Sequence, residues 1–249
     1  MKAKKILRKI HRNLVAIPRL AFGIGYKQYD KIIPGEISDD NFAKHIKEIA
    51  SNKTNKLFVE IGSSAGGGST KQFIESLIKR EDKGLCKLIC FEASQPRSTR
   101  LKNAYGQHDF VYIYNQSSIK LSDYPNYKEL IAFYLKTKSN LNRYGLIVVL
   151  SWLRLELKYL RKKGLGTNSG IEIMQKDFDE NIDVLLIDGS EFTGEAEFRY
   201  LKSAKYVLLD DINSFKNLRN YVNLSNSNDH QIIAVNRTLR NGYAIFKRN

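Results

Sequence analysis

A glycine cluster that follows an acidic residue is the first feature of this sequence that could do chemistry. Residues 57–70 read LFVEIGSSAGGGST, so a short apolar run containing Glu60 leads into Gly62, Gly66 and two further glycines before a polar Ser-Thr pair. Glycines directly after a strand allow the backbone to approach a ligand closely. Three kinds of site compete for this pattern: a phosphate-binding loop, a dinucleotide site and a site for S-adenosylmethionine.

The spacing argues against the first two kinds of site. A dinucleotide loop needs Gly-x-Gly-x-x-Gly, and Ser64 stands where the second glycine should be. A phosphate-binding loop needs a lysine that reaches the phosphates, and Gly68 occupies that position, while Lys71 comes three residues too late. What remains is an acid near the end of a strand, followed by Gly-x-x-x-Gly.

More acids stand at the ends of other expected strands. Glu92 ends LICFE about thirty residues after the glycine loop, Asp188 ends VLLID, and Asp210 and Asp211 end VLLDD. Three carboxylates at the carboxyl ends of adjacent strands would suit Mg²⁺ or Ca²⁺, which prefer oxygen ligands. The alternative is structural: the acid pair caps a following helix, and Asp188 shapes a turn.

The segment EIGSSAG resembles motif I of the class I S-adenosylmethionine-dependent methyltransferases. In that family the acid helps to hold the amino end of the cofactor, and the glycines allow close approach without a cationic side chain. The acid ending the second strand accepts hydrogen bonds from both ribose hydroxyls. The resemblance therefore implies the cofactor S-adenosylmethionine and these binding residues: Glu60, Gly62, Ser63, Gly66, Glu92, Ser117 and Asp188.

The later strand ends resemble the FkbM-type and related small-molecule O-methyltransferases, in which Asp-Gly-x-His is common. Here Glu191 and Phe192 follow Asp-Gly-Ser, so we do not expect a histidine base. We expect Asp188 and Glu191 to be catalytic and to take the proton from an acceptor hydroxyl. In relatives similar to catechol O-methyltransferase or cephalosporin hydroxylase, acids at these strand ends bind a divalent metal. The matching residues here are Asp188, Asp210 and Asp211.

Three functions follow from these motifs. The leading hypothesis is an O-methyltransferase that acts on a hydroxyl of a saccharide or glycoconjugate. The second keeps the fold without methylation, either as a metal-dependent hydroxylase-like enzyme or as a binding module in glycan assembly. The third is a degenerate P-loop nucleotide binder that uses VLLDD as its acidic strand, and the missing lysine argues against it.

Alternating strand and helix patterns must position these residues. Helical patterns follow strand patterns at 56–61, 86–92, 182–188 and 205–211, and a further strand pattern at 109–114 precedes a break of about sixty residues. The last two strands, 230–236 and 242–248, flank a turn containing Asn241-Gly242, which is typical of a hairpin. We predict an α/β, Rossmann-like, doubly wound and mostly parallel seven-stranded sheet, with a C-terminal antiparallel hairpin and a helical insertion at about 120–180.

The insertion contains a leucine stripe with heptad-like spacing, formed by Leu146, Leu150, Leu153, Leu157 and Leu160. We expect this helix to pack on the body as a lid and to shape substrate choice, because it precedes the fourth strand. Homodimerisation and docking on a membrane surface are the alternatives.

The net charge of +15 comes from two segments. Residues 1–31 hold nine Lys or Arg against one acid, and residues 120–163 hold ten against three. We therefore separate a basic amphipathic segment, 1–31, from a methyltransferase-like domain, 32–249. Such segments attract anionic lipids or phosphorylated glycans, and nucleic acid is the less favoured partner.

A helix is expected over residues 3–17, with Pro18 ending it. Its basic residues accompany an apolar stripe formed by Ile6, Ile10, Leu14 and Ile17. We predict that residues 1–20 lie on an anionic membrane surface. The alternative is that the stripe packs against the body.

The cysteines and the lengths of the apolar runs indicate the cellular compartment of the protein. Cys86 and Cys90 lie in an apolar run and are expected to be buried, reduced thiols. No apolar run approaches the ~20 residues that span a bilayer, and the basic start lacks the apolar stretch and cleavage site of a signal peptide. These features predict a cytoplasmic protein held peripherally at a membrane.

Overall fold

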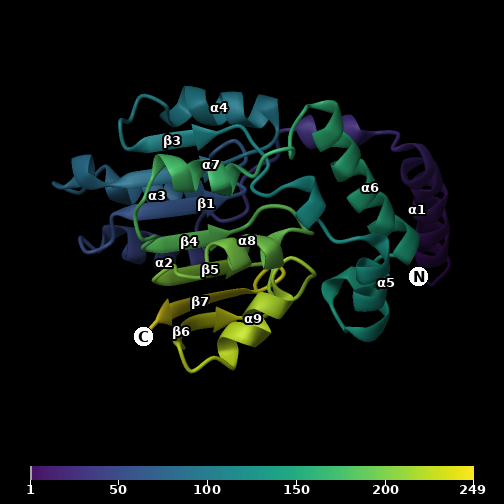
Figure 1. The fold of residues 1–249 in the computed structure, drawn as a ribbon. Helices are drawn as coiled ribbons and strands as arrows, with labels where there is room; N and C mark the ends of the chain where they lie inside the picture. Colours follow the sequence, from purple (N-terminus) through teal and green to yellow (C-terminus); the bar gives the residue numbers. More distant parts are fainter. Residues whose placement is uncertain (1) are drawn as a thin grey trace.

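The computed structural model describes residues 2–249, without the side chains of residues 2–10 and 13. The described residues form one seven-stranded sheet in the order β3-β2-β1-β4-β5-β7-β6, in which only β7 runs antiparallel to its neighbours (Figure 1). This is the predicted mostly parallel sheet with an antiparallel C-terminal hairpin. Its strands are β1 (Leu57–Ile61), β2 (Lys87–Phe91), β3 (Val111–Tyr114), β4 (Val184–Ile187), β5 (Tyr206–Asp210), β6 (His230–Asn236) and β7 (Tyr243–Arg248).

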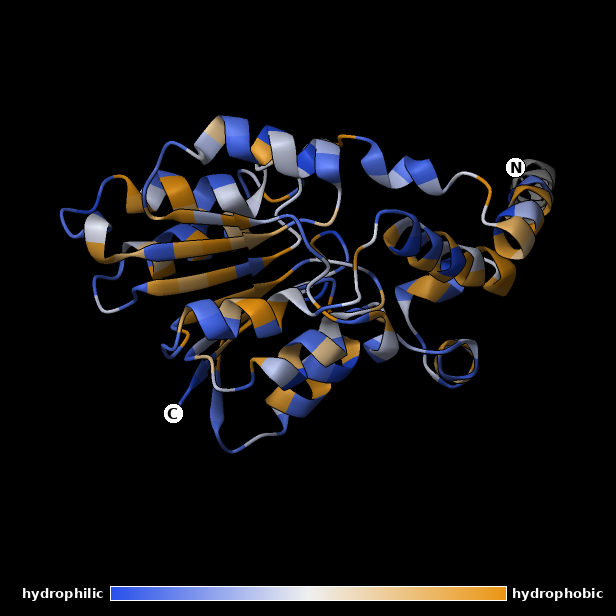
Figure 2. Cartoon of the chain, turned by 45° about the horizontal axis from the view of Figure 1, so that its top comes forward, coloured by the Kyte–Doolittle hydropathy of each residue, from blue (hydrophilic) through white to orange (hydrophobic). Residues whose placement is uncertain are grey.

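Helices cover both faces of the sheet, because successive strand residues point to opposite sides. On one face, Phe58 and Leu186 pack against α2 (Asn41–Ser51), α3 (Ser69–Leu77) and α4 (Gln95–Tyr105). On the other face, Val59 and Ile187 pack against α7 (Gly170–Asp177), α8 (Gly194–Tyr200) and α9 (Leu218–Ser225). Figure 2 shows that hydrophobic residues concentrate along the central strands, whereas many connecting loops are hydrophilic. The sheet is therefore doubly wound, as predicted.

The insertion between β3 and β4 is helical, as predicted, and includes α5 (Tyr127–Lys136) and α6 (Leu146–Lys162). These helices lie beyond the edge where the parallel strands end (Figure 1). Leu153 and Leu160 of the leucine stripe are buried. Leu153 joins a small core of its own, which includes Phe133 of α5 together with Phe192 and Phe215 from the body. The insertion therefore packs on the body within one chain, and homodimerisation stays a prediction.

The N-terminal helix corrects one prediction. Helix α1 spans Lys2–Phe22 and contains Pro18, which we expected to end it. A proline removes one backbone donor within a helix. Leu14, whose carbonyl that donor would have bonded, is 61% exposed, so water can reach this turn. The helix ends instead before Gly23, which has φ +63° and donates a hydrogen bond to the Arg19 carbonyl.

Helix α1 lies alongside α6 (Figure 1). The side-chain ammonium of Lys158 donates to the Phe22 carbonyl at 2.6 Å, and the hydroxyl of Tyr159 donates to Asp30 Oδ1 at 2.6 Å. The basic N-terminal segment is thus attached to the insertion. Both free cysteines are buried, as expected, and within residues 2–249 no helix is long and apolar enough to cross a membrane.

Candidate active site

A cavity of about 430 Å³ opens at the edge of the sheet where the parallel strands end. Its wall on the sheet side comes from residues that follow β1, β2 and β4, among them Gly62, Glu92 and Asp188. Its opposite wall comes from α6 through Trp152 and Glu156. Concave sites at this edge are where open α/β sheets bind ligands. Most of the predicted site residues are therefore brought to one place.

Gly62 follows the end of β1 and lies against Asp188, which follows the end of β4. Its φ is +93°, and a Cβ atom there would lie 2.3 Å from the Asp188 carbonyl oxygen. The amides of Gly62 and Ser63 both donate to the Phe91 carbonyl at 3.0 Å, which turns the chain away from the strand. Gly62 and Ser63 line the cavity, and their role in cofactor binding stays a prediction.

The other glycines serve packing. Gly66 has φ +82°, and a Cβ there would lie 2.6 Å from the Tyr105 ring of α4. Gly66 is not among the residues that line this cavity. Residues 33–37 cross over the loop, so a Cβ at Gly35 would lie 2.4 Å from the Gly68 amide nitrogen. Gly35 and Gly68 therefore let residues 33–37 pack directly on the glycine loop, and both residues also line the cavity.

Glu60 is fully buried behind the loop. Its two carboxylate oxygens accept hydrogen bonds of 2.6 Å from the hydroxyls of Ser69 and Thr70, and burial raises its pKa. Because these residues begin α3, Glu60 ties the start of the helix to β1. Glu60 does not line the cavity, so the structure gives it a supporting position behind the loop.

Glu92 and Ser117 both line the cavity. Glu92 Oε1 accepts a hydrogen bond of 2.6 Å from the Ser94 amide, and burial raises the pKa of this carboxyl group. Ser117 Oγ donates to the Ile119 carbonyl at 2.8 Å. The carboxylate of Glu92 is thus held at the end of β2, as expected for a group that accepts hydrogen bonds from a ribose.

The residues present fit S-adenosylmethionine. Ser64 Oγ is buried without a hydrogen-bond partner among the described residues, although Ser64 lines the cavity. A buried hydroxyl without a partner is unfavourable and indicates a missing ligand or water. Together with the cavity-facing carboxylate of Glu92 and the close-approach loop at Gly62, it forms a polar cradle that carries no lysine.

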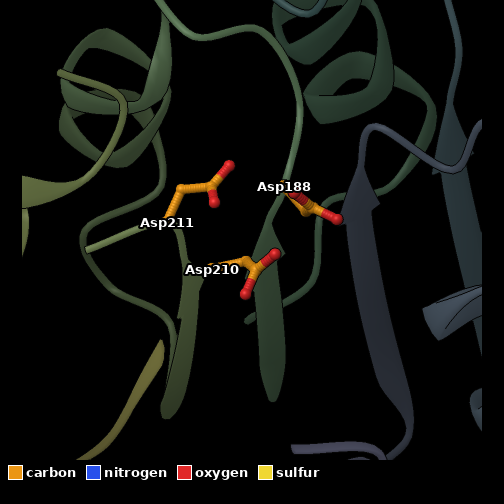
Figure 3. Close-up of side chains that lie close together, drawn as sticks. All are labelled: Asp188, Asp210 and Asp211. Carbon is orange, nitrogen blue, oxygen red and sulfur yellow. The ribbon is translucent and has the colours of Figure 1, made fainter. Parts of the chain in front are cut away.

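The predicted acidic cluster forms. One carboxylate oxygen each from Asp188, Asp210 and Asp211 lies within 4.8 Å of the others, at the ends of β4 and β5 (Figure 3). The ammonium of Lys216 donates to Asp188 Oδ1 at 2.9 Å and to Asp211 Oδ2 at 2.7 Å. Arg240 donates to Asp210 Oδ1 at 3.0 Å. All three carboxylates thus already have cationic partners, an arrangement that does not fit a divalent metal.

Opposite charges favour the ionised forms of Lys216 and Asp211, whereas burial raises the pKa of Asp188 well above its ordinary value. Burial lowers the pKa of Lys216, but the carboxylates of Asp188 and Asp211 outweigh it and raise that pKa well above its usual value. Burial alone would raise the pKa of Asp211, but the Lys216 ammonium lowers it below its ordinary value. The structural alternative for the acid pair, capping a helix, does not account for these ion pairs.

Solved structures share this fold at low sequence identity. An O-methyltransferase from Bacillus cereus in complex with S-adenosylhomocysteine is 12% identical, with a TM-score of 0.54 and coverage of 93% of this chain and 90% of that one. A proposed caffeoyl-CoA O-methyltransferase from Staphylococcus aureus is 14% identical, with a TM-score of 0.51 and full coverage of both chains. The chain has a Rossmann-like methyltransferase fold. No protein-family model matches the sequence, and no curated protein matches it significantly.

Within this methyltransferase fold, the cavity residues that were not predicted include Lys216, Glu156 and Tyr124. Lys216 lies in the segment that leads to α9, and only its position five residues after Asp211 hints at a role. Glu156 and Tyr124 come from the insertion, where nothing in the sequence distinguishes them from other polar side chains. The FkbM-type branch stays a prediction.

Two carboxyl groups in the cavity, one buried and one partly buried, have pKa values well above the ordinary range. Burial raises the pKa of Glu191 to about 7, and burial likewise raises the pKa of Glu156 to about 7. Such a carboxyl group is a stronger base than an ordinary one, and much of it is ionised at neutral pH. Glu191 follows β4 and Glu156 belongs to α6, so they approach the cavity from opposite walls.

Proposed function

We propose that the protein is an S-adenosylmethionine-dependent O-methyltransferase that acts on a hydroxyl of a saccharide or glycoconjugate. One observation carries the proposal: the Glu92 carboxylate and the Gly62–Ser64 loop face the same cavity as Glu191. A cofactor cradle and a base of suitable acidity therefore share one cavity. The methyltransferase fold supports the same conclusion.

S-adenosylmethionine, when bound, supplies a methyl group that its sulfonium already activates. The protein's main contribution is to align an acceptor oxygen with that methyl group. In the proposed mechanism Glu92 accepts hydrogen bonds from the ribose, and the loop at Gly62 approaches the amino acid end. Glu191 takes the proton from the acceptor hydroxyl. Asp188, our other predicted base, forms an ion pair of 2.9 Å with Lys216. We therefore assign Asp188 a structural role and not that of the base.

The proposed acceptor follows from the wall opposite the loop. Trp152 and Tyr29 line the cavity there with Tyr124 and Glu156, and the Tyr124 hydroxyl donates to Glu156 Oε1 at 2.9 Å. Aromatic rings offer apolar faces to a sugar ring, and carboxylates accept hydrogen bonds from several hydroxyls. This combination supports a polyhydroxylated acceptor.

Calorimetric titration of the full chain with S-adenosylhomocysteine, and separately with ATP·Mg, tests the cofactor. We expect one S-adenosylhomocysteine site and no ATP site. Binding of ATP·Mg alone would overturn the proposal in favour of the P-loop alternative. Transfer of a radiolabelled methyl group from S-adenosylmethionine to a panel of saccharides then tests the acceptor. Tight S-adenosylhomocysteine binding with no transfer would favour the binding module.

The N-terminal helix supports peripheral attachment to an anionic membrane as part of this proposal. Of the apolar stripe, Leu14 is 61% exposed and Ile17 is 51% exposed, whereas Ala16 is the residue buried against the body. The side chains of Ile6 and Ile10 lie outside the described residues. Helix α1 packs along α6, but the described half of the stripe is exposed beside a basic sequence, which leaves it available to a membrane surface.

A further inference from the structure

Lys216 is attached to the ends of both strands that carry the acidic cluster. The side-chain amide of its neighbour Asn217 donates to the carbonyls of Ile187 in β4 and Asp210 in β5, at 3.0 and 2.7 Å. On the other side, Gly194 packs so closely that a Cβ would lie 2.3 Å from the Lys216 carbonyl. The backbone of Lys216 is therefore held at one place relative to the aspartates.

The side chain is enclosed as well. It is 6% exposed, and its ammonium lies 2.9 Å from Asp188 Oδ1 and 2.7 Å from Asp211 Oδ2. These distances are those of charge-assisted hydrogen bonds. Asp211 also has φ +57°, a conformation that is unfavourable for a residue with a side chain and needs support from its surroundings. The ion pair with Lys216 and the hydrogen bond from the Ser214 amide to the Asp211 carbonyl give that support.

The third aspartate has its own cation. Asp210 accepts a hydrogen bond from Arg240, which also pairs with Asp40. Lys216 therefore serves two aspartates of the cluster and Arg240 serves the third. A buried carboxylate without a partner is strongly unfavourable, so each cation has a physical reason to stay.

A divalent metal would need the same three carboxylates. Mg²⁺ and Ca²⁺ bind carboxylate oxygens at about 2.0–2.6 Å, and oxygens that lie within 4.8 Å of one another could surround such an ion. The ammonium of Lys216 already lies between two of them. A metal at this position would face a buried positive charge at close range, which is strongly repulsive in an enclosed site.

We propose that Lys216 is the resident cation of this carboxylate cluster, so that the site functions without a divalent metal and excludes one. The cluster keeps its carboxylates close enough for an oxygen-ligand site, while the ammonium binds two of them and Arg240 binds the third. Removing the ammonium should therefore convert the three aspartates into a divalent-cation site. The inference goes beyond the proposed methyl transfer, and its test measures no methyl transfer.

The test is Mn²⁺ binding to the full chain, measured by electron paramagnetic resonance of free Mn²⁺ and by the Mn²⁺-dependent shift of the melting temperature. The variant Lys216→Met keeps the aliphatic packing and removes the charge, whereas Lys216→Arg keeps the charge. We expect no saturable site in the wild-type protein or in Lys216→Arg. In Lys216→Met we expect one site, at least about tenfold tighter than any wild-type binding, with a melting temperature that Mn²⁺ raises.

A ligand variant shows whether the metal uses the cluster. The double variant Lys216→Met/Asp211→Asn should lose the new site. One saturable Mn²⁺ site in the wild-type protein that Asp211→Asn abolishes would overturn the proposal, whether or not Lys216→Met folds. A folded Lys216→Met variant that still binds no Mn²⁺ would also overturn it. If S-adenosylhomocysteine failed to bind, the proposed function would fall while these outcomes would still decide the role of Lys216.

Discussion

The hydroxyl of Tyr124 donates a hydrogen bond of 2.9 Å to Glu156 Oε1, which joins the start of the insertion to its long helix inside the cavity. Burial raises the pKa of Glu156 to about 7, a further carboxylate at Glu197 raises it too, and Ser190, Tyr124 and Lys216 oppose these effects. The folded protein therefore binds the Glu156 proton more tightly than the unfolded chain does.

The pH dependence of stability follows with a defined sign. Because the folded pKa of about 7 exceeds the ordinary value of 4.5, the free energy of unfolding should fall as pH rises from the lower value through the higher one. Because Gln does not titrate, Glu156→Gln should reduce this pH-dependent fall in the free energy of unfolding by up to about 3 kcal/mol. Urea denaturation of both proteins at pH 5 and pH 8 measures it. Parallel pH profiles for wild type and variant would show that Glu156 is not the group responsible.

Glu92→Ala should weaken S-adenosylhomocysteine binding by about 1–3 kcal/mol, because ribose hydroxyls would lose their acceptor. Calorimetric titration measures the affinity. Glu92 Oε1 also accepts from the Ser94 amide, so Glu92→Gln, which keeps an acceptor there, separates stability from binding. Glu81→Ala, at a side chain that is 89% exposed, is the matched control. A loss of stability with unchanged affinity would show that Glu92 only holds the following turn.

Gly35→Ala should displace residues 33–37 from the glycine loop, since the new Cβ would lie 2.4 Å from the Gly68 amide nitrogen. We expect a lower melting temperature and weaker S-adenosylhomocysteine binding. Gly84→Ala is the control, because a Cβ there meets nothing within 4 Å. Equal behaviour of the two variants would mean that this crossing segment does not support the cofactor cavity.

Glu191→Gln should lower kcat by roughly 10²–10⁴-fold, the usual contribution of a general base. S-adenosylhomocysteine affinity should stay unchanged, because Glu191 is assigned to the acceptor proton and not to the cofactor. Single-turnover methyl transfer and calorimetry measure the two quantities. An unchanged kcat would remove Glu191 from the proposed chemistry.

Replacing Lys4, Lys5 and Lys9 by Gln should weaken binding to anionic vesicles by roughly 3 kcal/mol, at about 1 kcal/mol for each basic residue. Co-sedimentation with anionic and neutral liposomes at low and high salt measures this, because salt screens such charges beyond a Debye length of roughly 8 Å. Replacing the exposed Lys79, Lys83 and Lys102 is the matched control. If the two triple variants sediment equally, the N-terminal helix has no special role at the membrane.

The strands, the mostly parallel sheet with its antiparallel hairpin, and the gathering of acids at the carboxyl ends of the strands could be predicted from the sequence, because each depends on local periodicity and on rules for parallel sheets. Glu92 and Asp188 follow the ends of parallel strands. Such ends lie at one edge of the sheet, whatever the conformation of the loops. The same reasoning correctly placed Asp210 and Asp211 beside Asp188.

Long-range contacts determined the features of the site that the sequence did not predict. The sequence suggested that Gly62 needs no side chain because a cofactor approaches, but a Cβ there would also meet the Asp188 carbonyl of a neighbouring strand. The partner of Gly66 proved to be Tyr105, and Pro18 proved compatible with an exposed helix turn. No local pattern contains these neighbours.

Lys216 shows most clearly which features the sequence alone could not predict. By itself the sequence determined that three carboxylates would gather, and oxygen ligands in that number indicate a metal. Only the tertiary structure brought in an ammonium group, from a segment whose local pattern predicts merely the start of a helix. A lysine side chain is long and flexible, so its end can reach many points, and burial and charge select among them. That selection depends on the whole fold, because a buried carboxylate takes its partner from whichever segment the fold brings within reach.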